Sequence, residues 1–180
     1  MSNPTKKDDA SPKPSDNTSK WLGRLVEFSL LIIGFVALSS WLSSHLLDDG
    51  SQIPELSLPQ LSSNANGELN WPSSEDKTLV YFFAPWCSVC RISMPGLNLL
   101  PNDNLRVVAI AQDWEDRPEI EKFIADVGFN GEVLLGSPDT RAYFRVKGYP
   151  SYYVLDKNGQ VIHQDQGVST PPGLWLRTQL

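Results

Sequence analysis

Cysteine and histidine are scarce in this sequence, and their scarcity limits the sites that the chain can build. Among 180 residues there are two cysteines, Cys87 and Cys90, and two histidines, His45 and His163. No cysteine is left for a separate structural disulfide or for a four-cysteine zinc site. The two histidines stand far apart in the sequence, and neither has the close spacing of a ligand cluster. We therefore expect no metal site.

Positive charge is also scarce over most of the chain. Residues 48–180 carry ten Lys and Arg against seventeen Asp and Glu, a net charge of −7, whereas residues 1–47 carry five against four. Binding to nucleic acid needs clustered Lys and Arg that neutralise phosphates. We expect no nucleic-acid partner. At 180 residues the chain has room for one ordinary domain and a tail.

The N-terminal quarter of the chain divides into a polar part and an apolar part. Residues 1–20 are rich in Ser, Pro, Asn, Lys and Asp, which predicts a disordered cytoplasmic tail. The longest apolar run follows, from Phe28 to Leu42, with Trp21 and Trp41 near its ends. One bilayer crossing needs about 20 residues, and indole rings favour the headgroup level. We predict a transmembrane anchor over residues 21–47, with a cleaved signal peptide or a buried core helix as alternatives.

Basic residues set the expected orientation of this anchor. No Lys or Arg follows its apolar run before Lys77, and five precede that run, namely Lys6, Lys7, Lys13, Lys20 and Arg24. The positive-inside rule then leaves the N-terminus in the cytoplasm. In a bacterium the protein would be a single-pass protein of the inner (cytoplasmic) membrane, with its domain in the periplasm.

The rest of the sequence predicts an α/β domain behind a short extension. Residues 48–76, with turn formers such as Asn66-Gly67 and a possible edge strand at Ile53–Pro59, are interpreted as a linker and N-terminal extension. Residues 77–180 form the predicted domain. Apolar runs predict strands at 78–84, 105–111, 133–135, 152–155 and 161–164, and helices are predicted at 87–100, 118–127, 140–145 and after Thr170. This order indicates a mixed central sheet flanked by helices.

The cysteine pair lies where a buried strand runs into a helix. Cys87 should therefore sit at the helix N-terminus, where unpaired N–H groups favour a thiolate, and Cys90 should lie one turn further on, within disulfide reach. We predict that an exposed Cys87 attacks a disulfide and that a more buried Cys90 resolves the mixed disulfide. A purely structural disulfide and a metal site are the alternatives. The acidic loop around Asp113, Glu115 and Asp116 is expected to be exposed.

Two segments resemble the thioredoxin fold. The stretch 83–91 (FAPWCSVCR), followed by Met94-Pro95, is similar to the active-site strand and helix of that superfamily, and the stretch 148–151 (GYPS) is similar to its cis-proline loop. The resemblance implies that Pro150 is cis and faces the cysteine pair. It further implies that Pro150, Tyr149 and Trp86 line the groove that binds the substrate.

Within that superfamily the chain resembles the membrane-anchored TlpA/ResA-like branch. The helix near 118–127 and the strand near 133 fit its central insertion, and the ending 167–174 (GVSTPPGL) is most similar to the suppressor-for-copper-sensitivity D-type disulfide oxidoreductases. Two positions differ. Ser93 stands where ResA-like reductases carry a glutamate, and Tyr81 stands where thioredoxin has a buried aspartate.

This resemblance implies a thiol:disulfide oxidoreductase without a cofactor. It would act as a reductase on protein cysteines and would receive electrons from a transmembrane thiol reductant. Two other functions stay open from the sequence, a net disulfide oxidase or isomerase and a copper-handling module that uses the CxxC pair.

Overall fold

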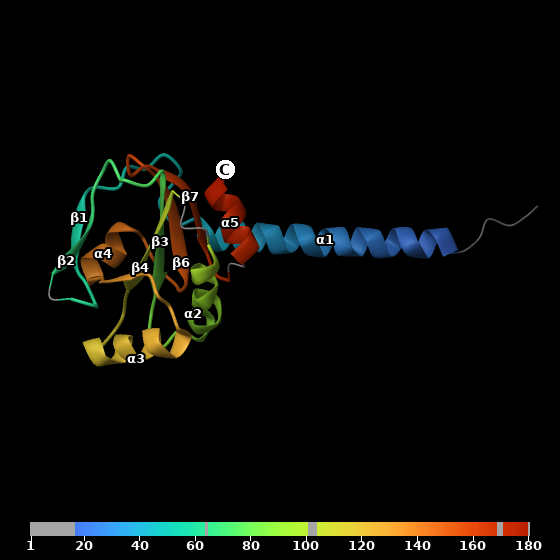
Figure 1. Ribbon diagram of the computed structural model, residues 1–180. Coiled ribbons are helices and arrows are strands. Elements are labelled where there is room, and N and C mark those ends of the chain that lie inside the picture. Colours follow the sequence, from blue (N-terminus) through green and yellow to red (C-terminus); the bar gives the residue numbers. More distant parts are fainter. Residues whose placement is uncertain (1–16, 64, 101–103, 169–170, 180) are drawn as a thin grey trace, which may run out of the picture. The chain divides into compact units, whose positions relative to one another are not determined.

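The computed structural model describes residues 17–63, 65–100, 104–168 and 171–179, and the chain divides into two compact units, 1–39 and 40–180 (Figure 1). The first unit holds most of the helix α1 (Asn17–Ser43). Of the predicted disordered tail, residues 1–16 lie outside the described residues, whereas residues 17–20 belong to α1. Many apolar side chains of α1 are exposed, among them Phe28, Leu31, Ile33, Phe35 and Trp41.

No helix in the described part of the chain has both the length and the apolarity that a membrane crossing requires. The end of the predicted anchor also differs from the sequence prediction. Helix α1 stops at Ser43, and Leu46 is buried in the core of the second unit. The backbone N–H of Leu47 donates a 3.2 Å hydrogen bond to the hydroxyl of Tyr153. Residues 46 and 47 therefore belong to the second unit, not to the helix.

A five-stranded mixed sheet forms the centre of the second unit, in the order β5-β4-β3-β6-β7. Strand β3 pairs in parallel with β4 and antiparallel with β6, so the predicted mixed sheet is confirmed. The bounds are β3 Lys77–Phe83, β4 Leu105–Ala111, β5 Glu132–Leu135, β6 Ser151–Asp156 and β7 Val161–Gln166. Leu79 to Phe83 are fully buried, as expected for a central strand that is covered on both faces.

Alternate residues of β3 supply two separate cores. Leu79, Tyr81 and Phe83 face one core, and Val80 and Phe82 face the other, because successive side chains of a strand point to opposite faces. The first core includes residues of the helices α2 (Ser88–Ser93), α3 (Arg117–Val127) and α5 (Pro171–Gln179). Phe83, for example, stacks on Phe123 of α3 with the ring centroids 5.2 Å apart.

The predicted helix over 87–100 is wrong in one respect, since it is two helices. The α-helix α2 (Ser88–Ser93) passes directly into the 3-10 helix η1 (Met94–Leu99). Pro95 explains the change, because a proline ring clashes with the carbonyl four residues earlier and offers no N–H. The other helices of the second unit are α3 Arg117–Val127, α4 Pro138–Tyr143 and α5 Pro171–Gln179.

The extension before β3 contributes a small antiparallel hairpin, β1 (Leu56–Pro59) and β2 (Asn66–Leu69). The predicted edge strand is thus found at its C-terminal half, but the predicted turn at Asn66-Gly67 is the start of a strand. A Cβ on Gly67 would lie 2.3 Å from a methyl group of Leu134. The glycine therefore permits the close approach of β2 to β5 and does not mark a turn.

Candidate active site

Cys87 and Cys90 form a disulfide at the point where β3 gives way to α2. Their Cα atoms are 5.3 Å apart. Cys87 is the N-cap of α2, and its Sγ accepts a 3.1 Å hydrogen bond from the backbone N–H of Cys90. In the reduced protein the same N–H would point at a thiolate on Cys87 and stabilise it.

The burial of the pair differs from the prediction. Cys90 is 0% exposed, as expected for a resolving cysteine, but Cys87 is only 6% exposed and not an open surface residue. Its Sγ lies 3.6 Å from the carbonyl oxygen of Tyr149, on the loop before β6. A motif far along the chain therefore covers Cys87, and sequence reasoning about the CxxC stretch alone could not reveal this cover.

The loop that covers Cys87 contains a cis peptide bond between Tyr149 and Pro150. Pro150 is buried, and its carbonyl accepts a 2.8 Å hydrogen bond from the backbone N–H of Gly167. The hydroxyl of Ser151 donates to the carbonyl of Gly148 at 2.8 Å. The structure thus places the loop beside the cysteine pair, in the arrangement that the resemblance implies.

Trp86 forms the exposed edge of the site, with 63% of its surface accessible. Its ring meets the ring of Tyr149 edge-on, with the centroids 5.8 Å apart. The indole N–H donates to the carbonyl of Asp113 at 3.2 Å. Trp86, Tyr149 and Cys87 therefore come from two loops that lie against each other.

Asp113 joins these loops to α4, a role that no local sequence pattern predicts. Its two carboxylate oxygens each accept a 2.8 Å hydrogen bond from Nη1 of Arg141, and the Tyr149 hydroxyl donates to one of them at 3.1 Å. Burial raises the pKa of Tyr149, and the nearby Asp113 charge raises it further, so the hydroxyl keeps its proton at neutral pH. Asp113 lies in the loop that we predict to be exposed. Of the three acidic residues of that loop, it is the one with a left-handed backbone, at a φ of 48°.

Beneath the disulfide lies a pair of hydroxyl groups and not a carboxylate. The hydroxyls of Tyr81 and Ser93 are 2.7 Å apart, and the Ser93 hydroxyl also donates to the carbonyl of Val89 at 3.0 Å. Ser93 lies one helical turn after Cys90 on the buried side of α2. Burial raises the pKa of Tyr81. The two positions that carry acids in related families, here Ser93 and Tyr81, are therefore occupied by neutral hydroxyl groups. Over the described ranges no Asp or Glu is buried.

We expect Ser93→Ala to destabilise the second unit by about 1–3 kcal/mol, because it leaves the buried Tyr81 hydroxyl without its partner. Tyr81→Phe should lower the free energy of unfolding by a smaller amount, because Ser93 keeps its hydrogen bond to the Val89 carbonyl. In urea unfolding, the double variant should recover part of the loss caused by Ser93→Ala. A double variant whose loss equals the sum of the two single losses would show that the hydroxyls do not interact.

The described residues contain no group of three or more His, Cys, Asp and Glu side chains that could hold a metal ion. The two cysteines are engaged with each other. The cysteine pair and the covering loop offer the chemistry of a dithiol and disulfide pair.

Comparisons with known proteins agree with this chemistry. Residues 75–161 match the family model described as thioredoxin-like. The thioredoxin-like protein YneN of Bacillus subtilis is 26% identical over 160 residues, which cover 84% of this chain and 91% of that protein. The thiol:disulfide interchange protein HelX of Rhodobacter capsulatus is 30% identical over 95 residues, which cover 51% of this chain and 53% of HelX.

A solved structure extends the similarity to the fold. It is the crystal structure of a thiol:disulfide interchange protein of the DsbE type from Chlorobium tepidum, 28% identical, with a TM-score of 0.64. The match covers 74% of this chain and 95% of that one. The resemblance to thioredoxin-fold thiol:disulfide oxidoreductases is confirmed. The narrower resemblance to the copper-sensitivity D type stays a prediction.

Proposed function

We propose that this chain is a thioredoxin-like protein-disulfide oxidoreductase and that it works as a reductase of protein disulfides. The observation that carries the proposal is the position of Cys87. Its Sγ accepts the N–H of Cys90 at the start of α2 and lies 3.6 Å from the carbonyl of Tyr149. A sulfur in that position has a donor that favours the thiolate and a loop against which a substrate can lie.

The reaction consists of two exchanges. The Cys87 thiolate attacks one sulfur of the client disulfide, so that an S–S bond forms between Cys87 and the client and the client's own S–S bond breaks. The released client thiolate takes a proton. The Cys90 thiol then loses its proton, and its thiolate attacks Sγ of Cys87, so that the Cys87–Cys90 bond forms and the S–S bond between Cys87 and the client breaks. The second client sulfur leaves as a thiolate and takes a proton. Two electrons pass to the client, and the protein is left with the Cys87–Cys90 disulfide that the structure contains.

The two cysteines have separate roles because their surroundings differ. Cys90 is fully buried, so a client sulfur cannot reach it, whereas the mixed disulfide on Cys87 lies one helical turn away. We assign Cys87 as the nucleophile and Cys90 as the resolving residue. We assign Trp86, Tyr149 and Pro150 to substrate binding, since Trp86 is exposed beside the loop that covers Cys87.

We further propose that α1, which covers residues 21–43 of the predicted anchor, holds the protein at the bacterial inner membrane with the catalytic unit in the periplasm. The apolar run Phe28–Leu42 and the exposed apolar side chains of α1 support this proposal. In an oxidising compartment a reductase needs a supply of electrons, and a tether raises its effective concentration near a transmembrane thiol donor. A mature N-terminus beyond Ser40, or protein recovered only in the soluble fraction, would contradict the anchor.

A redox titration of the Cys87–Cys90 pair tests the direction of electron flow. We expect a potential near that of thioredoxin, about −270 mV, as suits a protein that donates electrons. A value near that of a strong oxidant such as DsbA, about −120 mV, would overturn the reductase and favour a net oxidase. The oxidised fraction can be followed by thiol alkylation and mass spectrometry in defined glutathione or dithiothreitol mixtures.

A further inference from the structure

We propose that the positively charged cleft beside the cis-proline loop selects client segments that carry carboxylates near their disulfide. The inference rests on the proposed function and names the class of client for the same site. The cleft has a volume of about 400 Å³, and its lining includes Asp113, Arg141, Arg145 and Lys147.

The charge of this cleft contrasts with the acidic character of residues 48–180, which carry a net charge of −7. Arg141 is neutralised by Asp113, with which it forms two 2.8 Å hydrogen bonds. Arg145 and Lys147 are exposed and have no salt-bridge partner within the ranges that the structure describes. Three other guanidinium groups of the unit are paired with carboxylates, namely Arg91 with Asp126, Arg106 with Glu132, and Arg177 with Asp165. The Arg117 guanidinium instead donates to the backbone carbonyls of Gln60 and Leu61. The cleft is therefore a local positive surface on an acidic unit.

The backbone at Arg145 gives a second reason to regard its side chain as functional. Arg145 follows the C-cap of α4 and has a left-handed φ of 51°. Glycine usually occupies this place after a helix, because a side chain there costs conformational free energy. Arginine at such a position is consistent with a role of its charge in binding.

The cleft also shares residues with the reacting site. Lys147 lies three residues before Pro150, and the Arg141 guanidinium binds the same carboxylate that accepts the Tyr149 hydroxyl. The carbonyl of Tyr149 in turn lies 3.6 Å from Sγ of Cys87. An extended client chain spans about 3.3–3.6 Å per residue. Because Lys147 is three residues from Pro150 in the chain, about three or four extended client residues span the separation between them, so a carboxylate a few residues from the client cysteine reaches Lys147 while its disulfide lies at Cys87.

Three peptide disulfides that differ only in the flank of one cysteine test the proposal. The flank is three aspartates, three serines or three lysines, and the reduced full-length protein reacts with each in single turnover. We expect the acidic peptide to react about tenfold faster than the basic one at low salt, through faster association. The ratio should shrink in 0.5 M NaCl, as screening requires.

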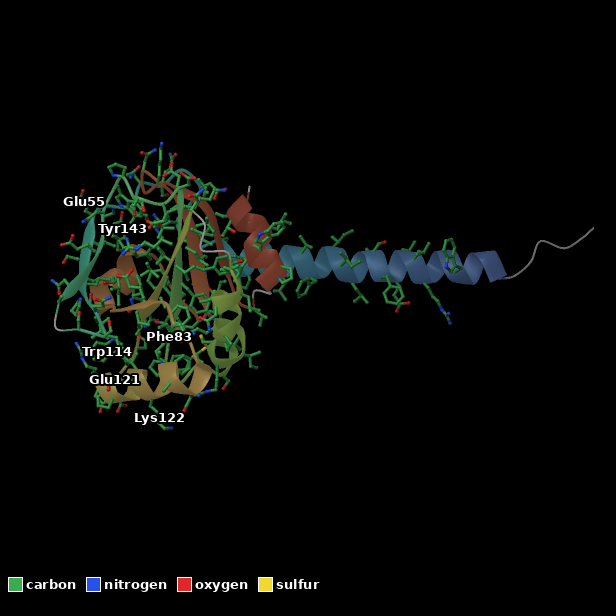
Figure 2. The ribbon with its side chains drawn as sticks, viewed as in Figure 1. Glu55, Phe83, Trp114, Glu121, Lys122 and Tyr143 are labelled. Atoms are coloured by element: carbon green, nitrogen blue, oxygen red, sulfur yellow. A yellow bond between two sulfur atoms is a disulfide. The ribbon has the colours of Figure 1, made fainter. Side chains whose placement is uncertain are left out.

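Charge-reversal variants supply the decisive comparison. Arg145→Glu/Lys147→Glu should invert the preference, whereas Lys122→Glu/Lys157→Glu, with the same change of net charge, should keep it. Lys122 lies on the outer side of α3 (Figure 2) and Lys157 in the turn between β6 and β7, both away from the residues that line the cleft. Arg145→Gly suits the left-handed backbone and should reduce the preference without loss of thermal stability.

The outcomes separate this inference from the proposed function. Equal rates for the three peptides, or an unchanged preference in Arg145→Glu/Lys147→Glu, would overturn the selection of acidic clients and leave the exchange reaction standing. If none of the three peptides reacted, the proposed function itself would fail, and the inference would fall with it. A preference lost equally in the Lys122→Glu/Lys157→Glu control would assign the effect to net charge and overturn the role of the cleft.

Discussion

A Cys90→Ala variant accumulates mixed disulfides with protein substrates through Cys87, whereas a Cys87→Ala variant accumulates none. This result is expected because Cys90 is the group that releases a client from Cys87, and it lies fully buried where a client sulfur cannot reach it. Non-reducing electrophoresis followed by mass spectrometry of the cross-linked peptides would identify the cysteine involved. In multiple turnover both variants should fall to the rate of the buffer control, since each lacks one of the two exchanges.

Stability is a necessary control for this experiment. The disulfide closes a ring with a sequence separation of three residues, and in the chain-entropy model so short a loop contributes only about 2 kcal/mol. Both variants should therefore stay folded by circular dichroism. Ser57→Ala, an exposed change on β1, should keep full turnover. Trapping through Cys90 would reverse the assigned roles, and no trapping together with tight copper binding by the reduced wild type would favour the copper-handling alternative.

The sheet and the cysteine pair could be predicted because their signals are local. The run 79–83 is apolar at every position, which only a strand covered on both faces explains, and the Cys pair follows it within the first turn of a helix. Pro95 was visible in the sequence as well. Its effect on helix type was not, because an amphipathic pattern has nearly the same spacing in an α-helix and in a short 3-10 helix.

The parts that could not be predicted depend on contacts between segments far apart in the chain. The role of Asp113 requires partners 28 and 36 residues away, Arg141 and Tyr149. Asn66-Gly67 alone is a turn signal, but in the structure it pairs with β1, and Gly67 lies against Leu134 of β5. In the sequence, Leu46 belongs to the apolar segment that predicts the anchor. In the structure it is buried in the same core as Tyr153, a residue more than a hundred positions away in the chain. In each case tertiary packing overrides the local pattern.

Phe144 is the residue whose truncation should destabilise the second unit most, and it connects that stability to the site. Its ring is 0% exposed and packs against Phe82 and Tyr153, with centroid separations of 4.8 and 5.3 Å. We expect Phe144→Ala to lower the free energy of unfolding, measured in urea, by about 3–5 kcal/mol. The slope of that free energy against urea concentration should stay unchanged. Phe144 is also the C-cap of α4, which carries Arg141, so turnover should fall before the unit unfolds.

The neighbouring residue provides the matched comparison for this change. Tyr143, labelled in Figure 2, is 42% exposed. Its ring meets the ring of Phe144 edge-on, with the centroids 5.4 Å apart. Tyr143→Ala removes an aromatic ring of similar size but leaves little buried cavity, so its cost should stay below about 2 kcal/mol. Equal losses for the two variants would mean that the Phe82–Phe144–Tyr153 cluster is not a main source of stability. The expected result is a larger loss of unfolding free energy for Phe144→Ala, with turnover that declines at urea concentrations below the unfolding transition. It would mean that this core holds Arg141 against Asp113 and thereby holds the loop that covers Cys87.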